Sequence, residues 1–178
     1  EALAVMTSLP NKPGTATEQE VFYWETVGEL AWNQNRPAIA RDAYYQLYLG
    51  RKLDETGYLR LTQTAVVTGR MDMAMEVART DWRENQHGDM IVSMLAAAQR
   101  ENRPDLTREL IAMAQTRPAV FEQSADYWQL YGDYQYQQRD LAKARRAYLK
   151  SLSLAPDDAG TRAALLATLA DGGYTDEL

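Results

Sequence analysis

The chain has 178 residues, a formal net charge of −6 at pH 7, and 46% hydrophobic residues, enough to build one domain or a short array of repeats. Its acidic balance argues against nucleic acid as a partner, because phosphate contacts need clustered Lys and Arg. The absence of cysteine excludes disulfides, thiolate zinc sites and cysteine nucleophiles.

Residues 1–16 come first. They contain a short apolar stretch around Leu3 and Val5, and then Asn11-Lys12-Pro13-Gly14. We expect the end of a preceding repeat followed by a linker. No apolar run in the sequence approaches the roughly 20 residues of a membrane-spanning helix. We therefore expect membrane contact only through parts of a longer protein outside these residues.

A capping box, Thr17-x-x-Glu20, predicts that a helix begins at the start of the segment 17–54. This segment has aromatic and small residues at fixed spacings, namely Trp24, Gly28, Ala40 and Tyr44. The same spacings recur in the segment 125–158, at Trp128, Gly132, Ala144 and Tyr148, with Pro156 at its end. The two segments lie about three periods of 34 residues apart, so two more repeats should fill the interval.

The two intervening repeats are predicted over 55–87 and 88–124, with weaker matches at the same positions. Their register is supported by the pair Asn35-Arg36-Pro37 and Asn102-Arg103-Pro104, in which each proline suits the first turn of a second helix. The second of these repeats has a longer loop that contains Pro118. After Asp140, a plausible N-cap, and the last full repeat, the segment 159–178 predicts the first helix of one more repeat. We accordingly expect a segment of a longer array.

The pattern Trp-x2-Tyr-Gly, followed by Ala-x3-Tyr and Pro, resembles the tetratricopeptide repeat (TPR) family. The resemblance implies an all-α fold, a right-handed helical solenoid of antiparallel helix pairs with about four repeats and a partial one. It also implies a scaffold that binds proteins.

Candidate chemistry is sparse. His87 is the only histidine and has no second histidine or cysteine to share a metal. Asp157 and Asp158 are adjacent, so on a helix they point apart, and a helix cap is the better interpretation. We expect no catalytic residue, no metal and no cofactor, and hence no enzyme. A glycan-cleaving carboxylate pair formed by Glu25 and Glu29 is the remaining enzymatic hypothesis.

In TPR arrays the first helix of each repeat lines a concave groove, and the resemblance assigns binding positions on that basis. The candidate binding residues are Glu25, Glu29, Trp32, Asn33, Gln63, Asp89, Asp126, Gln129, Asp133 and Tyr136. This face is acidic with aromatic points, which favours a positively charged partner. Glu25 and Glu29 stand where the carboxylate clamp of chaperone-binding TPR domains would need a cation and an amide, so that function is disfavoured.

Five aromatic residues do not all fit the packing positions and are candidates for an exposed binding surface. They are Trp32, Tyr45, Tyr48, Trp82 and Tyr136.

The stretches Trp24–Trp32 and Arg41–Leu47 resemble periplasmic TPR segments of bacterial exopolysaccharide export proteins of the Pel type. The resemblance implies a periplasmic scaffold, part of a larger outer-membrane-associated protein. Its partner would be a periplasmic polysaccharide deacetylase or hydrolase (PelA-like), and it would guide the polymer towards a pore. Two alternatives stay open: direct binding of a cationic exopolysaccharide by the acidic groove, and a generic protein–protein adaptor.

Overall fold

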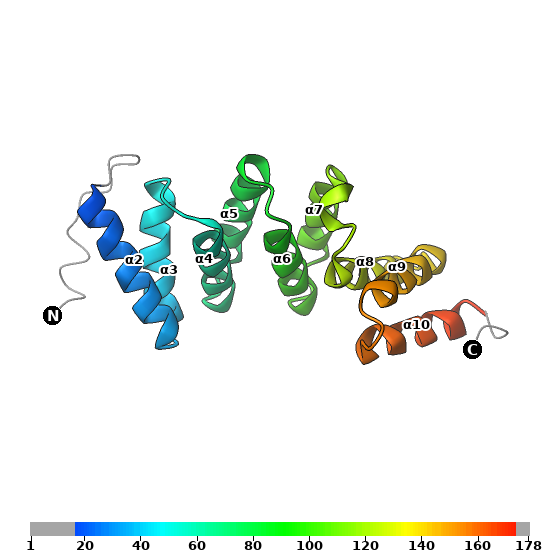
Figure 1. The fold of residues 1–178 in the computed structure, drawn as a ribbon. Coiled ribbons are helices and arrows are strands. Elements are labelled where there is room, and N and C mark those ends of the chain that lie inside the picture. The colour runs from blue at the N-terminus through cyan, green and yellow to red at the C-terminus, as the bar shows by residue number, and fades with distance from the viewer. Residues whose placement is uncertain (1–16, 174–178) are drawn as a thin grey trace. The chain divides into compact units, whose positions relative to one another are not determined.

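The computed structural model describes residues 17–173, and within this range the only regular secondary structure is helical (Figure 1). The helices are α2 (Glu18–Asn33), α3 (Pro37–Leu49), α4 (Glu55–Val67), α5 (Met71–Glu84), α6 (Gly88–Arg100), α7 (Pro104–Gln115), α8 (Ala125–Gln137), α9 (Leu141–Leu154) and α10 (Ala159–Asp171). The expected end of a preceding repeat and linker at 1–16, and the last residues of the segment 159–178, lie outside the described residues. Each predicted repeat from 17 to 158 contains two helices.

The helix ends follow the local chemistry of the sequence. Thr17 and Glu20 form the predicted capping box, in which the Thr17 hydroxyl accepts from the Glu20 amide and the Glu20 carboxylate accepts from the Thr17 amide. Pro37 and Pro104 stand in the first turns of α3 and α7, where a missing N–H costs nothing. Asp140 accepts from the Lys143 amide at the start of α9.

The connection between α7 and α8 is more ordered than the predicted loop. It contains a 3-10 helix, η1 (Pro118–Phe121), and the Phe121 ring is only 1% exposed. The ring stacks on Tyr127 with centroids 4.4 Å apart and on Trp82 at 5.6 Å. Burial of the Phe121 side chain therefore orders a segment that the sequence alone predicts to be a loop.

The chain divides into two compact units, with the boundary between Asp81 and Trp82 near the end of α5. In the first unit α3 packs between α2 and α4, and its inward side chains Ala40, Ala43 and Leu47 are buried. Tyr44 lies over Gly28, where the ring comes within 3.0 Å of the place that a Cβ would occupy. The glycine is therefore required for the close approach of α2 and α3.

In the second unit α6 packs on α7, α8 packs on α9, and α10 packs on α9. The α8–α9 pair repeats the arrangement of α2 and α3, because Tyr148 lies over Gly132 and is 1% exposed. Asp158 caps α10 by accepting from the amides of Gly160 and Thr161, as its predicted role as a helix cap requires. The prediction of an all-α fold built from helix pairs is confirmed.

The contact between Gly132 and Tyr148 predicts a large penalty for one added methyl group. A Cβ at Gly132 would lie 2.5 Å from Cε1 of Tyr148, whereas at Gly28 the equivalent distance to Tyr44 is 3.0 Å. Overpacking of this kind costs about 1–3 kcal/mol, against a gain of up to about 1 kcal/mol in helix propensity. We expect Gly132→Ala to lower the free energy of unfolding, and more than Gly28→Ala does, in urea melts followed by circular dichroism.

Gly160→Ala is the matched control, because a Cβ at this helical glycine would meet no aromatic ring. A loss of stability at Gly160 equal to that at Gly132 would contradict the assigned role of the tyrosine contact.

Candidate binding cleft

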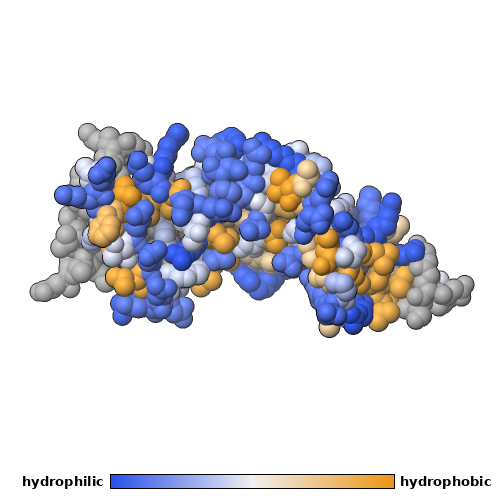
Figure 2. Space-filling model, viewed as in Figure 1, coloured by the Kyte–Doolittle hydropathy of each residue, from blue (hydrophilic) through white to orange (hydrophobic). Residues whose placement is uncertain are grey.

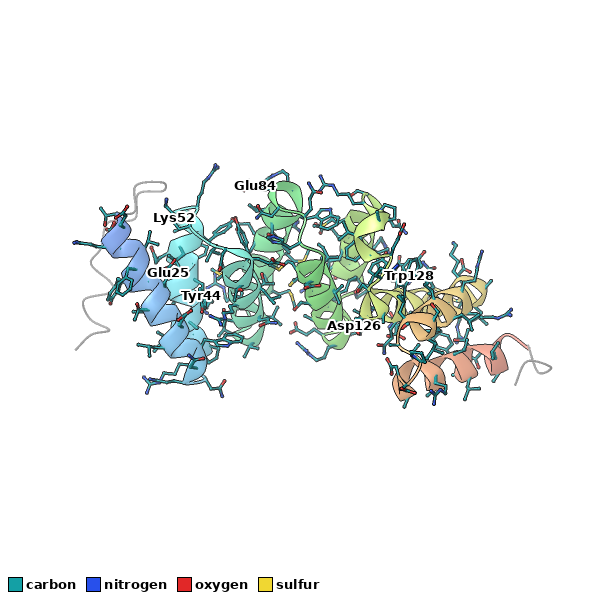
Figure 3. The ribbon with its side chains drawn as sticks, in the orientation of Figure 1. Glu25, Tyr44, Lys52, Glu84, Asp126 and Trp128 are labelled. Atoms are coloured by element: carbon teal, nitrogen blue, oxygen red, sulfur yellow. The ribbon has the colours of Figure 1, made fainter. Side chains whose placement is uncertain are left out.

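A cleft of about 600 Å³ lies in the first unit, between α2 and α4 and above the end of α3. Figure 3 labels three of its residues, Glu25 on α2, Tyr44 on α3 and Lys52 in the connection from α3 to α4. Two apolar side chains on its wall are strongly exposed, Phe22 at 71% and Leu30 at 54%. Figure 2 shows apolar residues among hydrophilic ones over this part of the molecule.

The Tyr44 hydroxyl reaches the cleft because the ring crosses α2 at Gly28. There it accepts a hydrogen bond of 3.0 Å from the Arg60 guanidinium. Burial raises the pKa of Tyr44, and the neighbouring Arg60 opposes this shift. The hydroxyl is therefore neutral near pH 7 and acts as a fixed acceptor for the arginine.

Three contacts hold the Arg60 side chain in place. Besides the bond to Tyr44, its guanidinium lies 5.6 Å from the centre of the Trp32 ring and 3.8 Å from the Glu29 carboxylate. Cation–π and ionic contacts at such partly exposed positions are each weak. Together they leave the guanidinium fewer orientations, so that a ligand of the cleft would meet a positioned cation.

The charge of the cleft is mixed rather than purely acidic. Glu25, Glu29 and Asp54 supply negative charge, and Lys52 and Arg60 supply positive charge. The predicted acidic face is thus corrected in this unit, because α4 and the α3–α4 connection add two cations that α2 alone does not reveal. A ligand with opposite charges at separate positions matches such a lining better than a uniform polycation.

The structure separates the predicted binding residues into several places. Glu25, Glu29 and Asn33 line the cleft described above. Trp32 and Gln63 instead line a second, smaller pocket of the same unit. The predicted groove residue Trp32 therefore touches the cleft only through Arg60.

The other predicted residues belong to the second unit. Asp89 is exposed in the first turn of α6, and Asp126 is exposed in the first turn of α8. Gln129 is half-buried on α8. Tyr136 donates a hydrogen bond of 2.6 Å to Asp171, so its hydroxyl is engaged within the fold.

Asp133 is half-buried beneath Tyr148, whose hydroxyl donates to it over 2.7 Å. Burial raises the pKa of Asp133, and the hydrogen bond from Tyr148 opposes the shift without cancelling it. The pKa of Tyr148 is also raised, first by burial and then by this carboxylate. Asp133 is thus already engaged as the hydrogen-bond acceptor of Tyr148 within the fold.

The five aromatic candidates for an exposed surface differ in burial. Trp82 is 6% exposed and packs against Phe121, so its assignment to a binding surface was wrong. Tyr45 and Tyr48 stack on one another, and the Tyr48 hydroxyl lies 3.1 Å from that of Thr80. Tyr48 thus joins α3 to α5, whereas the stacking of Tyr45 is within α3.

Two cations of the cleft, Arg60 and Lys52, were not among the predicted binding residues. Arg60 stands on α4, the first helix of its repeat, and first helices were expected to line the groove. Lys52 occupies the position at which Pro156 stands in the segment 125–158.

Within residues 17–173 no cluster of three or more His, Asp or Glu side chains could hold a metal ion. Among the described helices, none combines the length and apolar character needed to cross a membrane.

Paired helices with a tyrosine packed over a glycine, repeated along the chain, define a helical repeat protein. The chain belongs to the tetratricopeptide repeat family, whose profile matches residues 1–178. Comparison with curated protein sequences gave no significant match.

Solved structures support the same fold. One described as a crystal structure of MamA protein aligns with a TM-score of 0.75 and 16% identity, over 90% of this chain and 87% of that chain. Another, MamA MSR-1 C2, aligns with a TM-score of 0.63 and 17% identity, over 88% of this chain and 89% of that one. At this identity the likeness concerns the fold alone.

The pair formed by Asp133 and Tyr148 predicts a pH effect on stability. Because the pKa of Asp133 is raised in the folded state, the folded chain binds more protons than the unfolded chain. The wild-type stability therefore falls as pH rises from the unfolded value of about 3.9 through the folded pKa. We expect Asp133→Asn to remove this slope. In urea melts, the free energy of unfolding of the variant should therefore rise relative to that of wild type as the pH goes from 3 to 7.

Asp126→Asn on the same helix makes the matched charge change at an exposed position. Equal changes of slope in both variants would show that burial of Asp133 is not the cause.

Proposed function

We propose that this chain is a docking scaffold whose cleft between α2 and α4 binds a segment of a partner protein. TPR domains generally bind proteins, and the observation that carries the proposal is the combination of surfaces in this cleft. Exposed Phe22 and Leu30 stand beside Glu25, Glu29 and the positioned Arg60. The partner segment would insert apolar side chains and pair a basic group with the carboxylates.

The energetic case rests on burial of exposed apolar surface. Phe22 and Leu30 lose contact with water only if something covers them, and binding energy at interfaces concentrates on such anchors. The surrounding charges contribute register and specificity more than affinity. A lining of both charges therefore favours a partner segment that places basic groups opposite the carboxylates and acidic groups opposite Lys52 and Arg60.

Docking is better supported than hydrolysis. A glycosidase acid needs a carboxyl group shielded from water, which raises its pKa. Glu25 and Glu29 are both exposed. Their position on one open wall of the cleft suits recognition of a cation.

We infer that the larger setting is bacterial exopolysaccharide export of the Pel type, with this chain as part of the periplasmic TPR region of a PelB-like exporter. The inference rests on the resemblance of Trp24–Trp32 and Arg41–Leu47 to such segments. The docked partner would be a periplasmic polysaccharide deacetylase or hydrolase, and the scaffold would help to guide the polymer to an outer-membrane pore. A generic protein–protein adaptor is the coarser form of the same function.

Direct binding of a cationic glycan has less support. That hypothesis needs carboxylates and an aromatic platform on one surface, whereas Trp32 lies in a different pocket from Glu25. Lys52 and Arg60 would also repel a polycation.

The docking proposal predicts that Glu25→Arg and Phe22→Ser each weaken binding of the partner enzyme about tenfold or more, by loss of a charge pair or of an apolar anchor. Titration calorimetry with the purified enzyme measures the effect. The loss at Glu25 should shrink at high salt, and the loss at Phe22 should not.

Glu76→Arg provides the control, because Glu76 is exposed on α5 outside the cleft and undergoes the same change of charge. Equal losses at Glu25 and Glu76 would refute the cleft as the docking site. Failure of the folded wild-type chain to bind the enzyme at micromolar concentration would refute the Pel-type partner.

A further inference from the structure

The second pocket of the first unit has a chemistry of its own. It measures about 330 Å³ and lies at the turn from α2 to α3, beside the last turns of α4. Trp32, Pro37 and Val67 form its apolar wall, and Val67 is 70% exposed. Asn35, Arg36 and Gln63 supply its polar groups.

These polar groups are available to a ligand. In the part of the chain that the structure describes, the side chains of Asn35, Arg36 and Gln63 form no hydrogen bond or ion pair. Asn35 adopts a left-handed backbone conformation, with φ of 53°, which sets the direction of its Cα–Cβ bond. Two carboxamides and one guanidinium thus face a partly apolar pocket without partners.

Two equivalent corners in later repeats carry internal contacts. The echo Asn102-Arg103-Pro104 has the same turn, but there Arg103 is bound by Asp105 over 2.9 Å, whereas Ala38 stands at the corresponding position of the first corner. In the α8–α9 pair, Tyr136 takes the place of Trp32, and Tyr136 and Arg139 both engage Asp171. The first corner has none of these ion pairs, because among the described residues no acidic side chain stands beside Arg36.

We propose that this corner pocket binds one uncharged pyranose ring of a saccharide. The apolar C–H face of the sugar packs against Trp32 and Val67, as amphipathic ligands do on aromatic side chains. Its hydroxyls, which donate and accept hydrogen bonds, pair with Asn35 and Gln63, since each carboxamide also does both. The pocket volume lies at the small end of ligand sites, which are about 300–1,000 Å³, and suits a single ring.

Two competing ligand classes fit less well. A proline-rich peptide docks on aromatic grooves, but proline has no N–H, so the carboxamide oxygens would lack donors. A cationic amino sugar would need a carboxylate, and none lines this pocket, while Arg36 would repel it. The pocket is separate from the docking cleft, so either proposal can fail without the other.

The test titrates the folded chain with the methyl glycosides of glucose, galactose, mannose, N-acetylglucosamine and N-acetylgalactosamine, up to about 50 mM because single-sugar sites are weak. Amide chemical shifts report binding. We expect saturable shifts for at least one neutral sugar at Gln63, Val67 and the Trp32 indole. Asn35→Gly, which keeps the turn, and Gln63→Ala should each weaken binding about fivefold to tenfold through a lost hydrogen bond.

Asn102→Gly is the matched control, since Asn102 has the same conformation, with φ of 52°, in the closed corner. Equal weakening by Asn102→Gly and Asn35→Gly would overturn the assignment. So would the absence of shifts with every neutral sugar, stronger binding of glucosamine than of N-acetylglucosamine, or saturable binding of a polyproline peptide at the same amides. Unchanged thermal melts of the variants exclude unfolding as the cause of any loss.

Discussion

The packing of a tyrosine ring over a glycine is the contact on which the helix pairs α2–α3 and α8–α9 both depend. Tyr44 crosses α2 at Gly28, where a Cβ would make a tight contact of 3.0 Å, and Tyr148 crosses α8 at Gly132, where a Cβ would clash at 2.5 Å. The ring packs between the two helices; the Tyr44 hydroxyl lies at the cleft, and the Tyr148 hydroxyl meets Asp133 on α8. In the first unit this one interaction packs the core and places a polar atom in the lining of the cleft.

What each hydroxyl does there differs between the repeats. The Tyr44 hydroxyl accepts from Arg60, a residue of the next repeat, and so helps to build the lining of the cleft. The Tyr148 hydroxyl donates to Asp133 on its own helix pair, and the pair is satisfied internally. The same scaffold contact therefore contributes to the lining of a cleft in one unit and to an internally satisfied pair in the other.

The sequence determined the helices well because repeat spacing, caps and turn residues all indicate the same fold. It predicted the site only in part, since position on α2 selects Glu25 and Glu29 but says nothing about which side chains of α4 complete the cleft. Trp82 and Phe121 show the limit most clearly. Their stacking depends on a tertiary contact between α5 and η1, and no local pattern distinguishes a buried tryptophan from an exposed one.

Arg60 lies between the cleft and the corner pocket of the first unit. Its guanidinium bonds to Tyr44 and approaches Glu29 in the cleft, and it also lies over the Trp32 ring, whose other contacts line the corner pocket. A ligand that moved Trp32 would alter the support of Arg60, and a ligand that drew Arg60 away would uncover part of the ring. The cleft and the corner pocket therefore have separate linings, and Arg60 contacts residues of both.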